Sequence, residues 1–153
     1  VILHTGDFKI DSTPIEGKMI DLKRIGELGK KGILALMSDS TNAERPGFTQ
    51  SEKTVGTTLY NIFEEHKDTR IIVATFASNV DRVQQIINTA YRFAIEGRSM
   101  VNIIETAIEL GCLNVPADTL IDVDMLKNYP DEKTVIITTG SQGERLAALS
   151  RMA

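Results

Sequence analysis

The chain has 153 residues, of which 42% are hydrophobic and 25% charged, and its formal net charge is −4. This composition excludes an intrinsically disordered protein, and a chain of this length can bury roughly two thirds of its unfolded surface. The acidic balance excludes nucleic-acid binding through an overall positive field, so any such binding needs a local surface.

Short apolar segments alternate with amphipathic ones along the chain. It opens on a strand-like Val-Ile-Leu that leads into a Gly-Asp turn. Apolar, largely β-branched runs that end at polar residues or glycine predict buried strands, and apolar positions spaced three and four apart predict helices. The segments predicted after the opening strand are a strand at 33–37, a helix at 51–66, a strand at 71–76, helices at 80–93 and 99–110, and a strand at 135–139.

The ends of the predicted helices carry capping residues. Ser51, Asn79 and Ser99 have side chains that can accept a backbone N–H at a helix start, and Gly111 is suited to a helix end. Alternating strands and helices favour an α/β fold with an open, mostly parallel sheet and flanking helices. A helix over 80–93 leaves residues 94–97 before the next helix, which is short for a parallel crossover. The strand there is therefore truncated, or residues are missing.

An acidic turn follows the opening strand, in the run HTGDFKID at positions 4–11. A strand that delivers Asp7 at a glycine turn can present its carboxylate to a cleft, where one oxygen can bridge two cations. On the residues alone, an ordinary tight turn with a solvated Asp11 is the commoner explanation. His4 and His66 lie far apart in no paired motif, so these residues assemble no complete zinc site, which needs three or four ligands.

Polar segments also follow the later predicted strands. Asp39 lies in the run SDSTNAERPG at 38–47, where it can orient a histidine or hold a polar substrate, although a capping and turn cluster explains it equally well. The run GSQGE at 140–144 follows the last strand. Since α/β proteins bind ligands at the carboxyl ends of their strands, these loops predict a polar rim there.

The loop after the strand at 71–76 has features suited to RNA. Asn79 opens a helix whose N-terminus attracts phosphate, and Arg82 lies one turn further on. Ala77 and Ser78 are small enough for close approach to a ligand, and Phe76 can stack a base. The alternative is that Phe76 is the last core residue of its strand.

These segments together resemble the ribonuclease J family, metallo-β-lactamase-fold nucleases that carry an inserted β-CASP domain. The matches are collinear and cover nearly the whole chain, and the run at 39–47 is long enough to be specific. The matching segments are HTGDFK at 4–9, SDSTNAERPG at 38–47, SE at 51–52, FASN at 76–79, GRSM at 97–100 and TGSQGE at 139–144. The chain departs from the family at Arg145-Leu146, where Pro-Met is expected.

The resemblance implies that residues 1–50 are the C-terminal part of a metallo-β-lactamase αββα core and that 51–153 are most of the β-CASP domain. It implies that Asp7 bridges two zinc ions, that Asp39 serves catalysis as the acid of β-CASP motif A, and that single-stranded RNA contacts one loop. The residues of that loop are Phe76, Ala77, Ser78 and Asn79. The parent enzyme would hydrolyse RNA from its 5′ end and internally, and would form a homo-oligomer, a dimer or a tetramer.

The family's HxHxDH zinc motif and its Gly-His loop are not found within these 153 residues. We therefore expect the chain alone to lack hydrolytic activity. Two other functions fit the residues: a non-catalytic α/β ligand-binding or interaction domain, and another β-CASP nuclease such as an RNA 3′-end processing factor.

Localisation is predicted from three further features. No apolar run approaches the ~18 residues that span a bilayer, and the opening residues have no basic leader. The single cysteine, Cys112, excludes an internal disulfide and fits a reducing compartment. We expect a cytoplasmic protein without a membrane segment or signal peptide.

Overall fold

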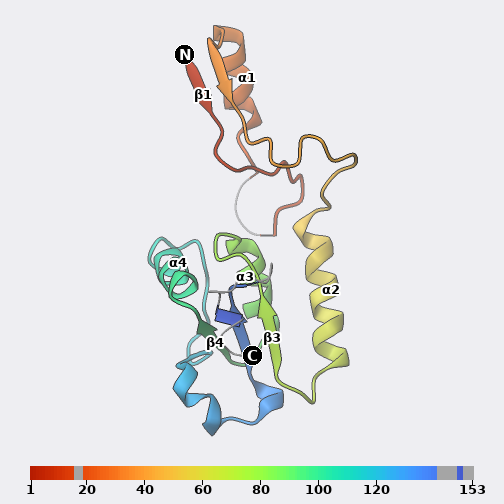
Figure 1. The fold of residues 1–153 in the computed structure, drawn as a ribbon, viewed down its shortest axis with the longest axis vertical. Coiled ribbons are helices and arrows are strands. Elements are labelled where there is room, and N and C mark those ends of the chain that lie inside the picture. Colours follow the sequence, from red (N-terminus) through yellow and green to blue (C-terminus); the bar gives the residue numbers. More distant parts are fainter. Residues whose placement is uncertain (16–18, 141–147, 150–153) are drawn as a thin grey trace. The chain divides into compact units, whose positions relative to one another are not determined.

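The computed structural model describes residues 1–15, 19–140 and 148–149 (Figure 1). The chain divides into two compact units, Val1–Lys53 and Thr54–Ala153. Both units pair their strands in parallel and connect them through helices, so the predicted α/β class is confirmed. Within the described residues, no helix combines the length and apolar character needed to cross a bilayer.

The first unit is a small β–α–β arrangement. Strand β1 (Ile2–His4) pairs in parallel with β2 (Ala35–Met37), with Ile2 opposite Ala35 and His4 opposite Met37. Helix α1 (Leu22–Lys31) connects them; the Asp21 carboxylate accepts a bond of 2.8 Å from the Arg24 N–H at its start. None of the side chains described in this unit is buried, so the unit has no apolar core within the described residues.

The second unit contains a four-stranded parallel sheet in the order β3-β6-β4-β5. Strand β6, the last in sequence, lies inside the sheet: Val135 pairs with Ile71 of β3 on one side and with Phe93 of β4 on the other. The strands are β3 (Ile71–Ala74), β4 (Phe93–Glu96), β5 (Leu120–Ile121) and β6 (Val135–Thr138). Helix α2 (Glu52–Glu65) begins with the last two residues of the first unit and continues in the second. The other helices are α3 (Val80–Thr89), α4 (Arg98–Glu109) and the 3-10 helices η1 (Val123–Asn128) and η2 (Asp131–Lys133).

The two faces of this sheet are covered by different elements. Phe93 and Ile137 point into the main core, with side chains of α2, α3 and α4, and both are fully buried. Ala94 and Ile136, the alternate positions of the same strands, pack against Leu126 of η1 on the second face. Burying one large apolar side chain contributes about 1.5–3 kcal/mol. This core fixes the strands, and the parallel register places their carboxyl ends at one edge.

The predicted helix over 80–93 is wrong at its C-terminal end. Helix α3 ends at Thr89, Ala90 has an extended backbone, and Phe93–Glu96 forms β4. The apolar residues at 93–95 also fit a helical period, but pairing with β6 determines that they form a strand. The strand that looked truncated or incomplete is therefore β4 itself.

Three of the four predicted capping residues are confirmed, and one is wrong. The Ser51 hydroxyl precedes α2 and accepts from the Lys53 N–H at 3.2 Å. Asn79 precedes α3, and its Oδ1 accepts a 3.0 Å bond from the Arg82 N–H. Gly111 has a φ of +67° after α4, and the next N–H, that of Cys112, donates to the Ala107 carbonyl at 2.8 Å. Ser99 does not cap α4; the capping position is Gly97, which has no side chain to do so.

Helix α1 and strand β5 were not predicted. Two glycines, Gly26 and Gly29, lower the helix propensity of α1, although Leu22, Ile25 and Leu28 follow a helical spacing that could have indicated it. Strand β5 has only two residues. The other predicted elements are confirmed with bounds that differ by at most two residues.

Candidate functional site

The loops that carry Asp7 and Asp39 meet in the first unit. They follow β1 and β2, whose parallel pairing brings both carboxyl ends to one edge. Thr5 joins the loops: its N–H donates to the Met37 carbonyl at 3.0 Å, and its Oγ1 accepts from the Asp39 N–H at 3.1 Å. A cavity of about 300 Å³ is lined by both loops, including Phe8, Lys9 and Asp39.

Asp7 is exposed, and it follows a tight turn at Gly6, which has a φ of +62°. The Gly6 N–H donates to the Nδ1 atom of His4 at 3.0 Å, so that ring nitrogen is already engaged as an acceptor. Among the described residues there is no cluster of three or more His, Cys, Asp or Glu side chains that could hold a metal ion. Asp7 suits the role of one oxygen ligand, but the described residues do not complete a zinc centre.

Asp39 lies in a polar turn. Its Oδ1 accepts from the N–H of Thr41 at 3.0 Å and from the Thr41 hydroxyl at 2.8 Å. These bonds, the backbone one first, hold the pKa of the Asp39 carboxyl below its usual value. Asp39 is therefore ionised at neutral pH, next to the Asp7 loop. The capping and turn geometry expected as the alternative is present.

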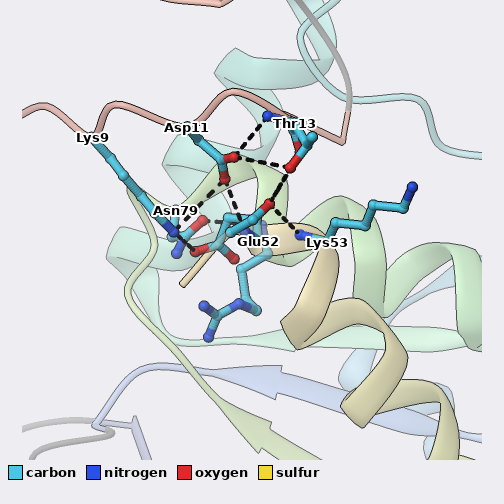
Figure 2. Close-up of polar contacts among 8 residues, drawn as sticks. Lys9, Asp11, Thr13, Glu52, Lys53 and Asn79 are labelled. Carbon is cyan, nitrogen blue, oxygen red and sulfur yellow. Dashed lines mark hydrogen bonds and ion pairs between the residues drawn. The ribbon is translucent and has the colours of Figure 1, made fainter. Parts of the chain in front are cut away.

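Asp11 is bound rather than solvated, contrary to the simpler interpretation of its sequence context. Its Oδ1 accepts from the Thr13 N–H at 3.0 Å and the Thr13 hydroxyl at 3.3 Å (Figure 2). Its Oδ2 accepts from the N–H of Glu52, the first residue of α2, at 2.9 Å. The side chain is 12% exposed. Asp11 thus satisfies a backbone donor of the first helical turn, where a negative charge is favoured.

Two further residues complete this network, as Figure 2 shows for Lys9. The Lys9 Nζ lies 3.1 Å from the Oε1 of Glu52 and 3.9 Å from the Oδ2 of Asp11, between two carboxylates. The Ser51 hydroxyl lies 2.8 Å from that of Thr13 and accepts from the Lys53 N–H at 3.2 Å. We call Lys9, Asp11, Thr13, Ser51 and Glu52 the loop clamp.

The acid sensitivity of the loop clamp provides a prediction. The backbone N–H of Glu52, followed by that of Thr13, lowers the pKa of Asp11 from 3.8 to about 2. A carboxyl whose folded pKa is depressed stabilises the fold above its unfolded pKa and loses that contribution as pH falls through the folded value. Asp11→Asn should therefore melt below wild type at neutral pH, and the difference should shrink as pH falls from 3.8 toward 2. Thermal melts across this range provide the measurement; a difference independent of pH would contradict it.

The loop after β3 presents alternate residues outward. Phe76 is 52% exposed, so it is not the last core residue of its strand, while Ala77 packs into the core and Ser78 is exposed. The Asn79 N–H donates to the Phe76 carbonyl at 3.1 Å, which closes the turn before α3. A ligand at this loop can therefore meet the Phe76 ring, the Ser78 hydroxyl and backbone groups.

The carboxyl edge of the four-stranded sheet has two helix N-termini. Helices α3 and α4 begin after β3 and β4, and Gly97 at the start of α4 supplies no side-chain cap. Helix N-termini attract phosphate groups. Gly97 also has a φ of +106°, and a Cβ there would lie 3.3 Å from the Thr139 Oγ1 and 3.0 Å from the Ala148 Cβ. The predicted rim extends to 140–144, of which 141–144 lie outside the described residues.

The family model described as "Ribonuclease J, beta-CASP domain" matches residues 68–153, from just before β3 to the last residue. The chain belongs to the ribonuclease J family. The resemblance found in the motifs is thereby confirmed, and the match favours ribonuclease J over other β-CASP nucleases.

Individual ribonucleases J are similar over almost the whole chain. Ribonuclease J of Synechocystis is 46% identical over 99% of this chain and 24% of its own length. Ribonuclease J of Helicobacter pylori strain J99 is 43% identical, over 99% and 22%. Ribonuclease J 1 of Streptococcus pyogenes serotype M3 is 49% identical, over 99% and 28%. The chain therefore spans about a quarter of the length of these relatives.

The sequence did not indicate the loop clamp or the link through Thr5. Asp11 and Thr13 have the spacing of a local Asp-to-backbone turn, which is a recognisable signal. The bonds to Ser51 and Glu52, however, join residues that are 38 and 41 positions apart, and no local pattern indicates them.

Proposed function

We propose that the full-length protein that contains this chain is a zinc-dependent ribonuclease, which hydrolyses RNA phosphodiesters from the 5′ end and internally. The observation that carries the proposal is the match to the ribonuclease J β-CASP domain over residues 68–153. The substrate is single-stranded RNA, the location is the cytoplasm, and the protein is a homo-oligomer, a dimer or a tetramer.

The first unit belongs, on this proposal, to the metallo-β-lactamase core and supplies acids to the reaction centre. Asp7 would be one of the ligands that hold the two zinc ions, and the bound ions would supply an activated hydroxide. Its exposure and the glycine turn before it support this role. Asp39 remains ionised through its bonds from Thr41, and it orients neighbouring ligands. The other zinc ligands come from residues beyond those described.

The second unit holds the RNA. The Phe76 ring stacks on a base, and Ser78 together with the helix N-terminus capped by Asn79 contacts the phosphates. The 52% exposure of Phe76 supports this role. Ala77 takes part through its backbone, since its side chain packs in the core. These contacts do not involve the hydrogen-bonding edges of the bases, so binding is expected to be independent of the RNA sequence.

A direct test compares the full-length protein with the 153-residue chain. The full-length protein should degrade 5′-monophosphorylated single-stranded RNA when zinc is present and lose activity with a chelator. The chain alone should show no cleavage at any zinc concentration, because one bridging carboxylate does not make a metal centre. Cleavage products resolved on denaturing gels provide the measurement. Zinc-dependent RNA degradation by the purified chain would contradict the incomplete site; an inactive full-length protein would contradict the function.

A further inference from the structure

The position of the Asp7 carboxylate depends on the backbone that carries it. Asp7 is exposed, and no side chain or backbone group in the described residues forms a hydrogen bond or ion pair with its carboxylate. Without such a partner, the position of the carboxylate is set by the backbone at the two ends of its loop. The loop therefore needs fixed ends if the carboxylate is to be placed within the ~0.5 Å that a catalytic site requires.

One end of this loop is fixed at Thr5. The backbone N–H of Thr5 donates to Met37 at 3.0 Å, which extends the pairing of β1 and β2 by one bond. Its hydroxyl accepts from the Asp39 N–H at 3.1 Å and donates to the Gly6 carbonyl at 2.6 Å. Thr5 thereby fixes the start of the loop to the end of β2.

The other end is fixed by the loop clamp, and Asp11 is its central member. Lys9 and Asp11 lie two and four residues after Asp7 and both reach Glu52 at the start of α2. The Asp11 carboxylate uses both oxygens, one for Thr13 and one for the helix N–H. The chain between the two anchors is therefore only Gly6, Asp7 and Phe8.

We propose that Asp11 is a positioning residue for RNA hydrolysis. It ties the Asp7 loop to Glu52 at the start of α2 and thereby keeps the Asp7 carboxylate in the position that catalysis needs. The proposal rests on the function proposed for Asp7. Asp11 acts through the backbone between itself and Asp7 and contacts no substrate. Asparagine has nearly the same shape, but it has only one acceptor oxygen. Its amide nitrogen is a donor, so it cannot replace the second oxygen that accepts a backbone N–H from Thr13 or Glu52.

The test uses Asp11→Asn in the full-length protein. We expect kcat to fall about 10–100-fold, as for other residues that orient a catalytic group, with KM for RNA unchanged. Hydrogen exchange of the amides at 5–11 should become faster, and this readout does not depend on catalysis. If Asp11→Asn does not accumulate as folded protein, Thr13→Val is the second variant. It removes the 3.3 Å hydroxyl bond to Asp11 and the 2.8 Å contact with the Ser51 hydroxyl but keeps the backbone bond from the Thr13 N–H, so it should give a smaller loss of kcat at constant KM.

Asp21→Asn is the matched control. Asp21 also accepts a backbone N–H at a helix start, at 2.8 Å from Arg24, but it belongs to α1 and takes no part in the loop clamp. It should leave kcat at the wild-type value and change the melting temperature little, because asparagine caps a helix about as well as aspartate. Wild-type kcat in Asp11→Asn, or a loss explained by its unfolded fraction, would overturn the positioning role.

Asp7→Ala, assayed in parallel, separates the two proposals. An inactive Asp7→Ala with a fully active Asp11→Asn overturns the positioning role and leaves the proposed function intact. A fully active Asp7→Ala overturns the metal-ligand role of Asp7, and with it the positioning role of Asp11, while the ribonuclease function itself stands.

Discussion

Asp7→Ala in the full-length protein is expected to abolish RNA hydrolysis and to leave RNA binding close to wild type. In the proposed function, the carboxylate serves the metal ions and the second unit holds the RNA backbone. If Asp7 holds the metal ions as proposed, its loss should lower kcat at least 100-fold, at the upper end for groups that orient a metal. Single-turnover cleavage and RNA affinity in the presence of chelator measure the two effects separately.

Asp68→Ala provides the control for Asp7→Ala. Asp68 is an exposed carboxylate that follows α2 in the second unit. Its removal changes the net charge by the same amount and should alter neither kcat nor affinity. Unchanged cleavage by Asp7→Ala at saturating zinc would show that Asp7 is not a bridging ligand; a large loss of RNA affinity would place it at the RNA surface instead.

Phe76→Ala should weaken RNA binding by about 5- to 150-fold, because base-to-aromatic stacking contributes about 1–3 kcal/mol per base. The loss should be similar for oligomers of different sequence, since a ring stacks on any base. It should be smaller for long RNAs, which have further contacts. Fluorescence titrations with short RNAs of several sequences, under a fixed salt concentration, provide the measurement.

Tyr91→Ala is the matched aromatic control. Tyr91 is 77% exposed and lies between α3 and the start of β4. The proposed RNA loop follows the end of β3, so the two lie at opposite edges of the parallel sheet. The Tyr91→Ala variant should bind RNA with wild-type affinity. A lower melting temperature for Phe76→Ala, with unchanged affinity of the folded fraction, would show that the ring stabilises the fold and does not contact RNA.

The fold was predictable where the deciding interactions are local. The buried runs at β3 and β6 are unambiguous apolar segments, and Asn79 and Gly111 act within their own turns. Strand β4 was not predictable, because its apolar residues continue the period of α3. Only pairing with β6, which lies about forty residues later, makes it a strand.

The site was predictable in part for the same physical reason. A glycine turn after a strand marks Asp7 from sequence, and a polar run after the next strand marks Asp39. The contact between their loops depends on the Thr5 hydroxyl, and the place of Asp11 depends on a helix start 41 residues away. Such hydrogen bonds depend on the tertiary fold, so no local sequence pattern indicates them.

The location of β6 has a consequence for the order in which the second unit folds. Strands β3 and β4 are made first, yet each pairs with β6 and not with the other, so both have a vacant ladder edge until residues 135–138 are available. During synthesis, a nascent chain that stops short of Val135 cannot close the sheet, however well its helices form. Contacts so distant in sequence raise the contact order and slow folding. The interval before β6 emerges is therefore when the open strand edges are most prone to aggregation.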